Sequence, residues 1–571
     1  MAGAAVRRVR PGDAGWPGEE AWKALSDRVQ GRLLRVESPL EKPGPELVKE
    51  MKNPYFIGDQ VWGTQSTGWA GAWTSSPSAY AVAAENAADV SAAVDFARSH
   101  RLRVVVKGGG HSYQGTSSAR DSLLIWTRRM RDLTVYDAFV PRGCEGRLDP
   151  VPAVGVDAGA LWFHTYDAVT TRGGRYVQGG GCATVGVAGL VQGGGFGSFS
   201  KRYGMAAASL LEAEVVTADG VTRIANACTH PDLFWALKGG GGPSFGVVTR
   251  LTLRTHALPP TFGAVLLTLD ADSDAAFKRL IRQFVAFYAT SLMNPHWGEQ
   301  VRLYRRNRVS VQMLFQGLDG AQAEGVWRPF LDDVSRPGSG IRVGADRTIA
   351  AFPARDFWNP EFLRTKLGPY VRSDDRPGAD SGNIWWASNE EELGAYWHGY
   401  ESTWLPASLL SAGRQEALAS ALFAASRHWT VGLHFNKGLA GAPSEAPTAA
   451  RETSINPLVL DAFALAIIAG SGPPVYPGVA AHEPDPVEAR SDAQAIHRAM
   501  AELRKVVPKA GSYVLETSYF EPNWQRAFWG NNYPRLRAVK KKYDPGGLFI
   551  VHHGVGSEDW SSDGMTHVSS R

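Results

Sequence analysis

Two short stretches govern the interpretation of this sequence: residues 107–113 read Lys-Gly-Gly-Gly-His-Ser-Tyr, and residues 178–186 read Gln-Gly-Gly-Gly-Cys-Ala-Thr-Val-Gly. Two further glycine clusters stand at 193–195 and 239–242. Glycine lets a ligand approach the backbone closely, and successive N–H groups form a concavity that attracts anions such as a pyrophosphate. Four clusters in one region therefore indicate a shared binding site rather than four unrelated turns.

The common nucleotide motifs do not account for these glycines. No cluster matches GxGxxG between a strand and a helix, and a Walker A motif is missing from the sequence. A nicotinamide-binding Rossmann domain and a P-loop ATPase are therefore disfavoured. His111 and Cys182 stand directly after two of the triplets, where flexible backbone could bring an imidazole and a thiolate to the edge of a ligand.

Length and composition exclude several classes of protein. The chain has 571 residues, which suggests two or three domains, and 44% of them are hydrophobic, which is enough for a sizeable core. The net charge is +4 and no run of five basic residues occurs, so nucleic acid is not expected as a partner. The most apolar stretch, Ala462–Gly470, is much shorter than the roughly 20 residues that span a bilayer, so no membrane partner is expected either.

Cysteine usage and the N-terminal sequence do not establish in which cellular compartment the protein resides. Cys144, Cys182 and Cys228 show no CxxC spacing, and Cys144 could pair with Cys228 if Cys182 has another role. Arg7 and Arg8 are followed by polar residues where a signal peptide needs an apolar run. The protein is then either cytoplasmic or had a signal removed, and the sequence does not decide. It does not indicate an oligomeric state either.

The order of predicted elements indicates an α+β fold. A helical pattern over Ala83–Arg101 runs into a strand at Val104–Val106, and Glu214–Ile224 predicts a hairpin with its turn at Asp219-Gly220. Pro259-Pro260 marks a boundary, after which strands and helices predict a sheet covered by helices on one side. Seven tryptophans of this second half fit either a packed core or the wall of a ligand cavity (Trp297, Trp327, Trp358, Trp385, Trp386, Trp397, Trp404).

Three separated motifs carry a resemblance to a known family. They are Lys107–Tyr113, the run Gly179–Gly195, and Trp235–Thr249; two C-terminal runs, Trp529–Leu536 and Tyr543–Phe549, agree with them. Together they resemble the FAD-linked oxidases of the vanillyl-alcohol-oxidase superfamily, more narrowly its berberine-bridge-enzyme-like group and the isoamyl-alcohol-oxidase-like branch. The resemblance covers roughly residues 60–560.

The resemblance implies a two-lobed PCMH-type FAD-binding domain and an antiparallel-sheet substrate domain covered by helices. The expected organisation is an N-terminal arm (1–50), the FAD-binding domain (51–258), the substrate domain (259–505) and a C-terminal segment (506–571) that returns to the FAD domain and closes the site.

The resemblance also implies a bicovalent flavin, with His111 bonded to its 8α carbon and Cys182 to its C6. Other residues are expected along the pyrophosphate, ring and adenine (Gly108, Gly109, Gly110, Ser112, Tyr113, Gly186, Gly193, Gly194, Gly246, Val248, Asn532). Val185 matches the position where valine admits oxygen and isoleucine excludes it. Lys107-Gly108 replaces the Arg-Ser often found before Gly-Gly-His in the family, and the role of that pair is therefore left open.

Hydride removal beside a hydroxyl needs a base, and the family often has a Tyr-x-Asn motif for it. Here Gly530 stands two residues before Asn532, so that tyrosine is missing. Tyr533 is then the first candidate, Glu516 the second and Tyr519 the third. Alternation over Tyr513–Glu521 predicts a strand with Glu516 on the face opposite Tyr519, and the three lysines 540–542 are expected to face solvent.

No metal site is predicted. His552 and His553 are adjacent, and on a strand adjacent side chains point to opposite faces. The expected function is an FAD-dependent oxidase that takes a hydride from an alcohol, sugar or hydroxylated metabolite and reduces O₂ to H₂O₂. The alternatives are a secondary-metabolism tailoring oxidase or dehydrogenase, performing oxidative cyclisation or using another acceptor, and a flavin-loaded protein with little turnover.

Overall fold

The first lobe of the computed structural model, which describes residues 7–568, begins with a small sheet ordered β1-β4-β6-β5. Strands β4, β6 and β5 are parallel, and β1 pairs antiparallel with β4 at one edge. Helix α4 connects β4 to β5, and Asn86 caps its first turn by accepting from the backbone N–H of Asp89. The bounds are β1 Leu33–Arg35, β4 Tyr80–Ala83, α4 Ala87–Ser99, β5 Arg103–Lys107 and β6 Ser122–Trp126.

The second part of this lobe is a five-stranded antiparallel sheet ordered β11-β10-β12-β8-β7. The predicted hairpin is confirmed, because β10 and β11 pair on either side of Asp219-Gly220. Cys144 and Cys228 form a disulfide with their Cα atoms 5.6 Å apart, which decides the pairing that the sequence left open. The bounds are β7 Leu133–Phe139, β8 Val151–Asp157, β10 Leu210–Val216, β11 Thr222–Asn226 and β12 Val247–Arg254.

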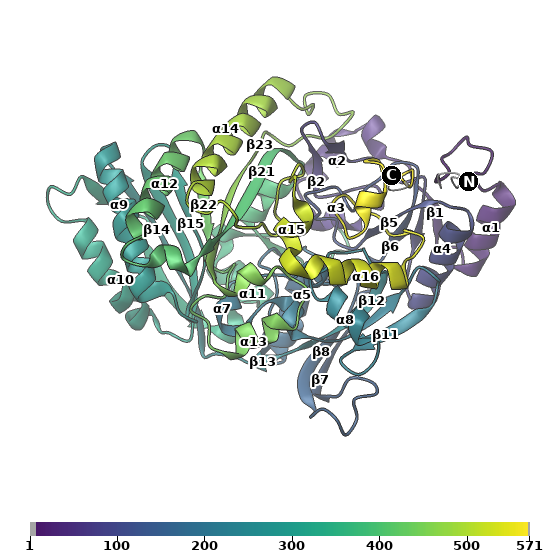
Figure 1. Ribbon diagram of the computed structural model, residues 1–571, viewed down its shortest axis with the longest axis horizontal. Coiled ribbons are helices and arrows are strands. Elements are labelled where there is room, and N and C mark those ends of the chain that lie inside the picture. Colours follow the sequence, from purple (N-terminus) through teal and green to yellow (C-terminus); the bar gives the residue numbers. More distant parts are fainter. Residues whose placement is uncertain (1–6, 569–571) are drawn as a thin grey trace.

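The other lobe is built on a large sheet, ordered β17-β14-β16-β15-β22-β23-β21-β2-β3, with β18 also paired to β14. Helices α9, α12 and α14 lie along this sheet, as Figure 1 shows, and their apolar faces share one core with it. The principal bounds are β14 Thr261–Ala271, α9 Asp274–Phe287, β15 Trp297–Tyr304, β16 Arg308–Gln316, β21 Ala395–Pro406, α12 Gln415–His428, β22 Val431–His434, β23 Ala462–Ser471 and α14 Pro486–Arg504. The expected α+β class is confirmed.

One strand of the large sheet comes from the N-terminal part of the chain. Strand β2 (Ser66–Trp69) pairs in parallel with β21, while the neighbouring pairs along β21 and β23 are antiparallel. A core that includes Trp69, Phe196 and Tyr513 fills the junction of the two lobes. The lobes are therefore joined by backbone pairing as well as by side-chain packing.

The tryptophans of the second half are mainly core residues. Trp297, Trp327, Trp358, Trp385, Trp397 and Trp404 are buried, while Trp386 is partly buried and packs against the core. Among the described residues, no helix combines the length and the apolar character that crossing a membrane requires.

The C-terminal segment lies across the first lobe, where α16 (Tyr533–Tyr543) packs against α8 (Pro231–Leu237), as Figure 1 shows in yellow. Lys540 does not face solvent as expected: it is 4% exposed and donates to Asp544 and to the carbonyl oxygens of Ser244 and Phe549. The predicted strand over residues 513–521 is also wrong. These residues form turns, with a single bridge between Tyr513 and Glu516, because the adjacent strand β21 already pairs with β23 and β2.

Candidate active site

A cavity of about 230 Å³ lies among the glycine loops of the first lobe. Its walls come from the end of β5, from the loop after β8 and from β12, so the two sheets of this lobe both contribute. Cys182 is not among the residues that line it, but ten of the predicted cofactor and catalytic residues are: Gly108, Gly109, Gly110, His111, Ser112, Tyr113, Val185, Gly186, Val248 and Glu516.

Two glycine loops meet at this cavity, and their contact depends on the absence of a side chain at Gly109. A Cβ on Gly109 would lie 2.7 Å from the carbonyl oxygen of Thr184 and 2.8 Å from the nitrogen of Gly186, closer than real Cβ contacts. The loop after β5 therefore touches the loop that carries Cys182 only because this residue has no side chain. At this contact His111 Nε2 lies 2.9 Å from the hydroxyl of Thr184.

His111 and Cys182 converge on one carboxylate, that of Glu392. His111 Nδ1 lies 3.5 Å from Glu392 Oε2, and Cys182 Sγ lies 4.0 Å from Oε1. Tyr113 donates its hydroxyl to Oε1 at 2.7 Å, and Asn389 donates to the sulfur of Cys182 at 3.4 Å. Two side chains that are 71 positions apart thus approach the carboxylate of Glu392, which lines the cavity.

The pKa values of Cys182 and Glu392 are set by burial and by the neighbouring charges. Loss of hydration raises the pKa of the Cys182 thiol well above its usual value, and the charges of Glu392, Glu516 and Glu299 raise it further. Burial opposes ionisation of Glu392, but the neighbouring His111, Tyr113 and Lys437 bring its pKa below the usual value. Glu392 is accordingly ionised near neutral pH, and the thiol beside it is protonated.

Glu516 lines the cavity and pairs with Lys437, whose ammonium donates to Glu516 Oε2. Lys437 stands in the loop after β22 and is buried, so the pair joins the large sheet to the cavity. The backbone carbonyl oxygen of Glu516 accepts from the hydroxyl of Ser402 at 2.5 Å, which fixes the turn that presents the carboxylate.

Glu299 belongs to the same charged group and was not identified from the sequence. It lies in β15 with φ of +66°, a backbone conformation that non-glycine residues rarely adopt. Its carboxylate accepts from the hydroxyl of Ser198, and burial raises its pKa, an effect that Ser198 and Lys437 oppose and Glu516 reinforces. Strained residues of this kind are found at functional sites, and this one faces the junction of the lobes.

Tyr533 does not line the cavity, although the sequence ranked it first as a base. Its hydroxyl donates to Glu558 Oε1 at 2.5 Å, and burial followed by that carboxylate raises its pKa. Asn532 is also outside the lining and donates to the carbonyl oxygen of Ile455 at 2.9 Å. The remaining named glycines pack against protein: Gly193 against Leu515, Gly194 against Ile455 and Gly246 against Val216.

The two adjacent histidines are not on a strand, which corrects the prediction that they point to opposite faces. They lie in a turn where His553 has φ of +51°, and their rings stack with centroids 3.8 Å apart. Tyr519 stacks on His552 at 3.6 Å and Trp524 on His553 at 5.2 Å, so four rings form one column. Burial lowers the pKa of both histidines, that of His553 to about 3, and both are therefore neutral near pH 7.

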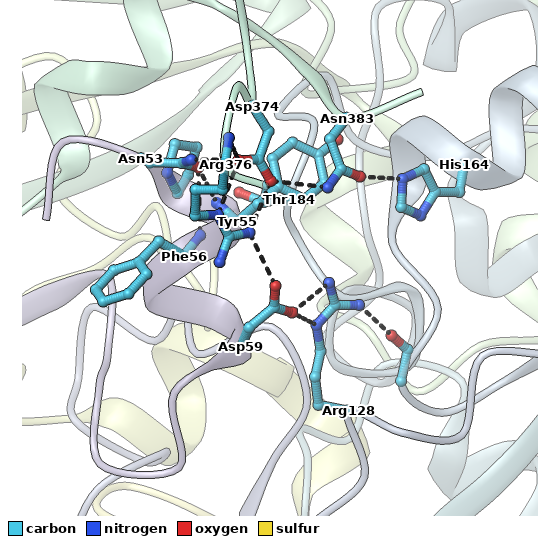
Figure 2. A network of polar contacts seen from close by, with 12 residues as sticks. Asn53, Tyr55, Phe56, Asp59, Arg128, His164, Thr184, Asp374, Arg376 and Asn383 are labelled. Atoms are coloured by element: carbon cyan, nitrogen blue, oxygen red, sulfur yellow. Dashed lines mark hydrogen bonds and ion pairs between the residues drawn. The ribbon is translucent and has the colours of Figure 1, made fainter. Parts of the chain in front are cut away.

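A polar network fixes residues 374–383, which precede Glu392 in the chain (Figure 2). Asp59 pairs with both Arg128 and Arg376 at 3.0 Å, and Arg376 pairs with Asp374 at 2.6 Å. Asp374 also accepts from Asn383, whose side-chain oxygen lies 2.9 Å from His164 Nε2. The network ties residues 374–383 of the second half of the chain to α3 (Pro54–Asp59) and α5 (Trp162–Tyr166).

The cavity fits a flavin dinucleotide on two observations. Its entrance loops present backbone from Gly108–Gly110 and from Gly186, and no side chain crowds these positions. His111 Nδ1 is buried and makes no hydrogen bond within residues 7–568, its carboxylate neighbour Glu392 lying 3.5 Å away, so this nitrogen can bond to a bound group.

Comparison with known proteins agrees with this geometry. The FAD binding domain family matches residues 77–226, and the family described as berberine and berberine like matches residues 512–556. A VAO-type flavoprotein oxidase of Thermothelomyces thermophilus is 30% identical over 97% of this chain and 94% of that protein.

Two solved structures extend the comparison. A VAO-type flavoprotein from Myceliophthora thermophila C1 superposes with a TM-score of 0.78, at 26% identity over 97% of this chain and 98% of that one. The glucooligosaccharide oxidase of Acremonium strictum, described with a 6-S-cysteinyl, 8α-N1-histidyl FAD, has a TM-score of 0.64 at 19% identity, covering 87% and 96%. The chain therefore belongs to the VAO-type, berberine-bridge-like flavoproteins and is an FAD-dependent oxidoreductase.

Proposed function

We propose that this protein is an oxidase that holds FAD through two covalent bonds, from His111 and from Cys182. The observation that carries the proposal is the convergence of both side chains on Glu392, which lines the cavity. The description of the Acremonium strictum oxidase, with its cysteinyl and histidyl FAD, supports the same pair of links here.

The covalent links are tested on denatured protein. Wild-type protein should keep yellow, fluorescent flavin through denaturing electrophoresis, and peptide mass spectrometry should find FAD on the peptides that contain His111 and Cys182. His111→Ala should retain the cysteine link alone, and the double variant with Cys182→Ala should contain only dissociable FAD. Release of all flavin from the wild type on acid precipitation would contradict the proposal.

The proposed reaction converts a carbon that bears a hydroxyl and a hydrogen into a carbonyl. Bound FAD supplies a two-electron acceptor for the hydride and a route for those electrons to O₂, so that the products are a carbonyl compound and H₂O₂. The protein must remove the hydroxyl proton as the hydride leaves. Glu516 is the proposed base, because its carboxylate lines the cavity and Tyr533 does not.

Lys437 supports this role for Glu516. Its ammonium donates to Oε2 of Glu516, which orients the carboxylate and leaves Oε1 for a substrate hydroxyl. Tyr113 and Glu392 lie on the same side of the cavity and can hold other polar groups of the substrate. The substrate class proposed is therefore a small alcohol, sugar or hydroxylated metabolite.

The reaction is tested by mixing a panel of alcohols and sugars with the enzyme under anaerobic conditions. Bleaching of the flavin absorbance reports hydride transfer whatever the final acceptor, and adding air then reports the acceptor through H₂O₂. Bleaching without H₂O₂ would replace the oxidase by a dehydrogenase. No bleaching by any member of a broad panel would contradict turnover of this substrate class.

A further inference from the structure

A second cavity, of about 350 Å³, lies beside the flavin cavity and is lined by different chemistry. One side is the edge strand β5, and the other is formed by residues 519–564 of the C-terminal segment. The two cavities share His552 and His553 as part of a common wall. His111, Glu392 and Glu516 do not line the second cavity, so it is distinct from the proposed reaction site.

Arg103 gives the second cavity a positive charge. Its partly buried guanidinium lines the cavity, and within residues 7–568 it has neither a carboxylate within 4 Å nor a hydrogen-bond acceptor. Asp563 acts on it only from a longer distance and is itself paired with Arg10 at 2.8 Å. A partly buried guanidinium stays charged, and a planar anion can satisfy it with two parallel hydrogen bonds.

The other lining groups that can carry a charge are already paired or neutral, and Arg8, which lies behind the ring of Trp560, donates to the carbonyl oxygens of Gly547 and Leu548. Glu558 lines the cavity but accepts from Tyr533 and lies 3.4 Å from Arg537. The two histidines are neutral near pH 7, because burial lowers their pKa values. Arg103 is therefore the uncompensated charge among the described lining residues.

Part of the cavity wall is formed by aromatic rings. Tyr519 and Trp524 form the two ends of the column that contains the histidines, and the ring planes of Tyr519 and His552 are nearly parallel, at 2°. Trp73 and Trp560 also line the cavity, together with small polar residues such as Ser118 and Ser561. Such walls favour a planar ligand, since ring faces pack against each other over a large area.

From these features we propose that the second cavity binds a small planar organic anion, with an aromatic carboxylate as the class that matches both the guanidinium and the aromatic walls. The carboxylate would take two hydrogen bonds from Arg103, and the ring would lie among Trp73, Tyr519 and Trp560.

Calorimetric titration of the flavin-loaded enzyme with benzoate tests this site. Benzoate should bind, while benzyl alcohol, which lacks the charge, and acetate, which lacks the ring, should each bind at least about tenfold more weakly. Arg103→Gln should weaken benzoate binding by about 10- to 100-fold, the range for a charge-assisted hydrogen-bonded pair. Arg120→Gln, at an exposed arginine outside the cavity lining, is the matched control and should bind benzoate as the wild type does.

The flavin content of each variant, from the ratio of flavin to protein absorbance, distinguishes a lost site from a damaged protein. If Arg103→Gln loses flavin, Arg103→Lys is measured in place of that variant. Arg103→Lys keeps the positive charge and should lose part of the affinity for benzoate. Equal benzoate affinity in the wild type and the Arg103 variants, equal affinity for benzyl alcohol, or no binding at millimolar benzoate would each overturn the proposal. This outcome is independent of the proposed reaction, because calorimetry requires no turnover.

Discussion

At the scale of single residues, Glu516 and Tyr533 differ in what surrounds each side chain. The carboxylate of Glu516 opens on the cavity and is held by Lys437. The hydroxyl of Tyr533 is committed to Glu558, and its raised pKa makes the phenolate less accessible near neutral pH. Its position in the cavity lining and its available oxygen both favour Glu516 over Tyr533 as the catalytic base.

Glu516→Gln is therefore expected to slow flavin reduction by substrate about 10²- to 10⁴-fold, the usual contribution of a general base. Substrate binding should change little, because the amide keeps the shape of the carboxyl group. Tyr533→Phe is the matched control and should reduce at nearly the wild-type rate. Rapid-mixing measurements of flavin absorbance under anaerobic conditions give the rate of flavin reduction for each variant. Rapid reduction in Glu516→Gln together with slow reduction in Tyr533→Phe would assign the base to Tyr533 instead.

Val185 lines the cavity close to Cys182, and replacing it with isoleucine adds one methylene to that wall. We expect Val185→Ile to slow reoxidation of dithionite-reduced enzyme by O₂. A penalty of about 1.4 kcal/mol, within the range for overpacking, corresponds to about tenfold in rate. Val185→Ala should not slow it. Stopped-flow reoxidation gives both rates, and identical rates for valine and isoleucine would count against an oxygen path at this wall.

The site residues that sequence reasoning found are those with a local signature. His111 and Cys182 each follow a glycine triplet, so their spacing is visible along the chain. Glu392 stands in the run Asn-Glu-Glu-Glu, which is typical of a solvated surface, and nothing next to Lys437 or Glu299 marks them. These three reach the site only because the large sheet packs on the first lobe, and one sequence does not reveal such a contact.

At the scale of elements, α16 is fixed to the first lobe by a buried ion pair. Lys540 and Asp544 are 2.6 Å apart and almost fully buried, and Asp544 also accepts from the backbone N–H groups of Leu548 and Phe549. Lys540 in turn donates to the carbonyl oxygen of Ser244. This single lysine therefore joins the helix, the following turn and the loop that begins with the fourth glycine cluster.

Lys540→Met should lower the free energy of unfolding by about 3 kcal/mol, because it leaves the Asp544 carboxylate buried without its cation. Lys541→Met, at an exposed neighbour on the same helix, should change it by less than about 0.5 kcal/mol. Urea unfolding followed by far-UV circular dichroism measures both. Adding Asp544→Asn to Lys540→Met should recover part of the loss, and an unchanged urea midpoint for Lys540→Met alone would refute the argument.

Two elements were misjudged from the sequence for related physical reasons. Alternation over residues 513–521 predicted a strand, but alternation stabilises a strand only where a partner strand supplies hydrogen bonds. The exposure of Lys540 was inferred from its charge, whereas its methylene stem and three acceptors allow burial. By contrast, the hairpin at Asp219-Gly220 was predictable, since its turn residues and its strands are neighbours in the sequence.

At the scale of the whole molecule, the free energy of unfolding should decrease as the pH falls, because the partly buried His256 has a lowered pKa. Burial and three nearby arginines lower the pKa of His256 to about 4, against about 6.5 in an unfolded chain. Between these values the unfolded chain binds a proton that the folded protein does not. Stability from this group is therefore fully present above about pH 6.5 and is lost as the pH falls towards 4.

His256→Gln should remove this contribution. The wild type should lose up to about 1.4 kcal/mol more per pH unit than the variant across this window, in addition to losses from carboxylates that both proteins share. His497→Gln, at an exposed histidine, should follow the wild type. Urea unfolding at about pH 6.5, 5.5 and 4.5 gives the slopes, and parallel slopes for the wild type and His256→Gln would show that His256 does not contribute.

The parallel pairing of β2 with β21 has a consequence for engineering this scaffold. If the lobe built on the large sheet were excised at Pro259-Pro260, it would lose β2, which pairs with β21. The backbone N–H and C=O groups of β21 would then be exposed to other chains. Exchanging lobes between relatives to change their substrates therefore requires that residues 66–74 be moved together with the second half of the chain. In a chimaera with a single crossover, β2 would come from the other relative, and its Trp69 position would have to pack against a foreign β21, whereas a graft with two crossovers would retain the native pair.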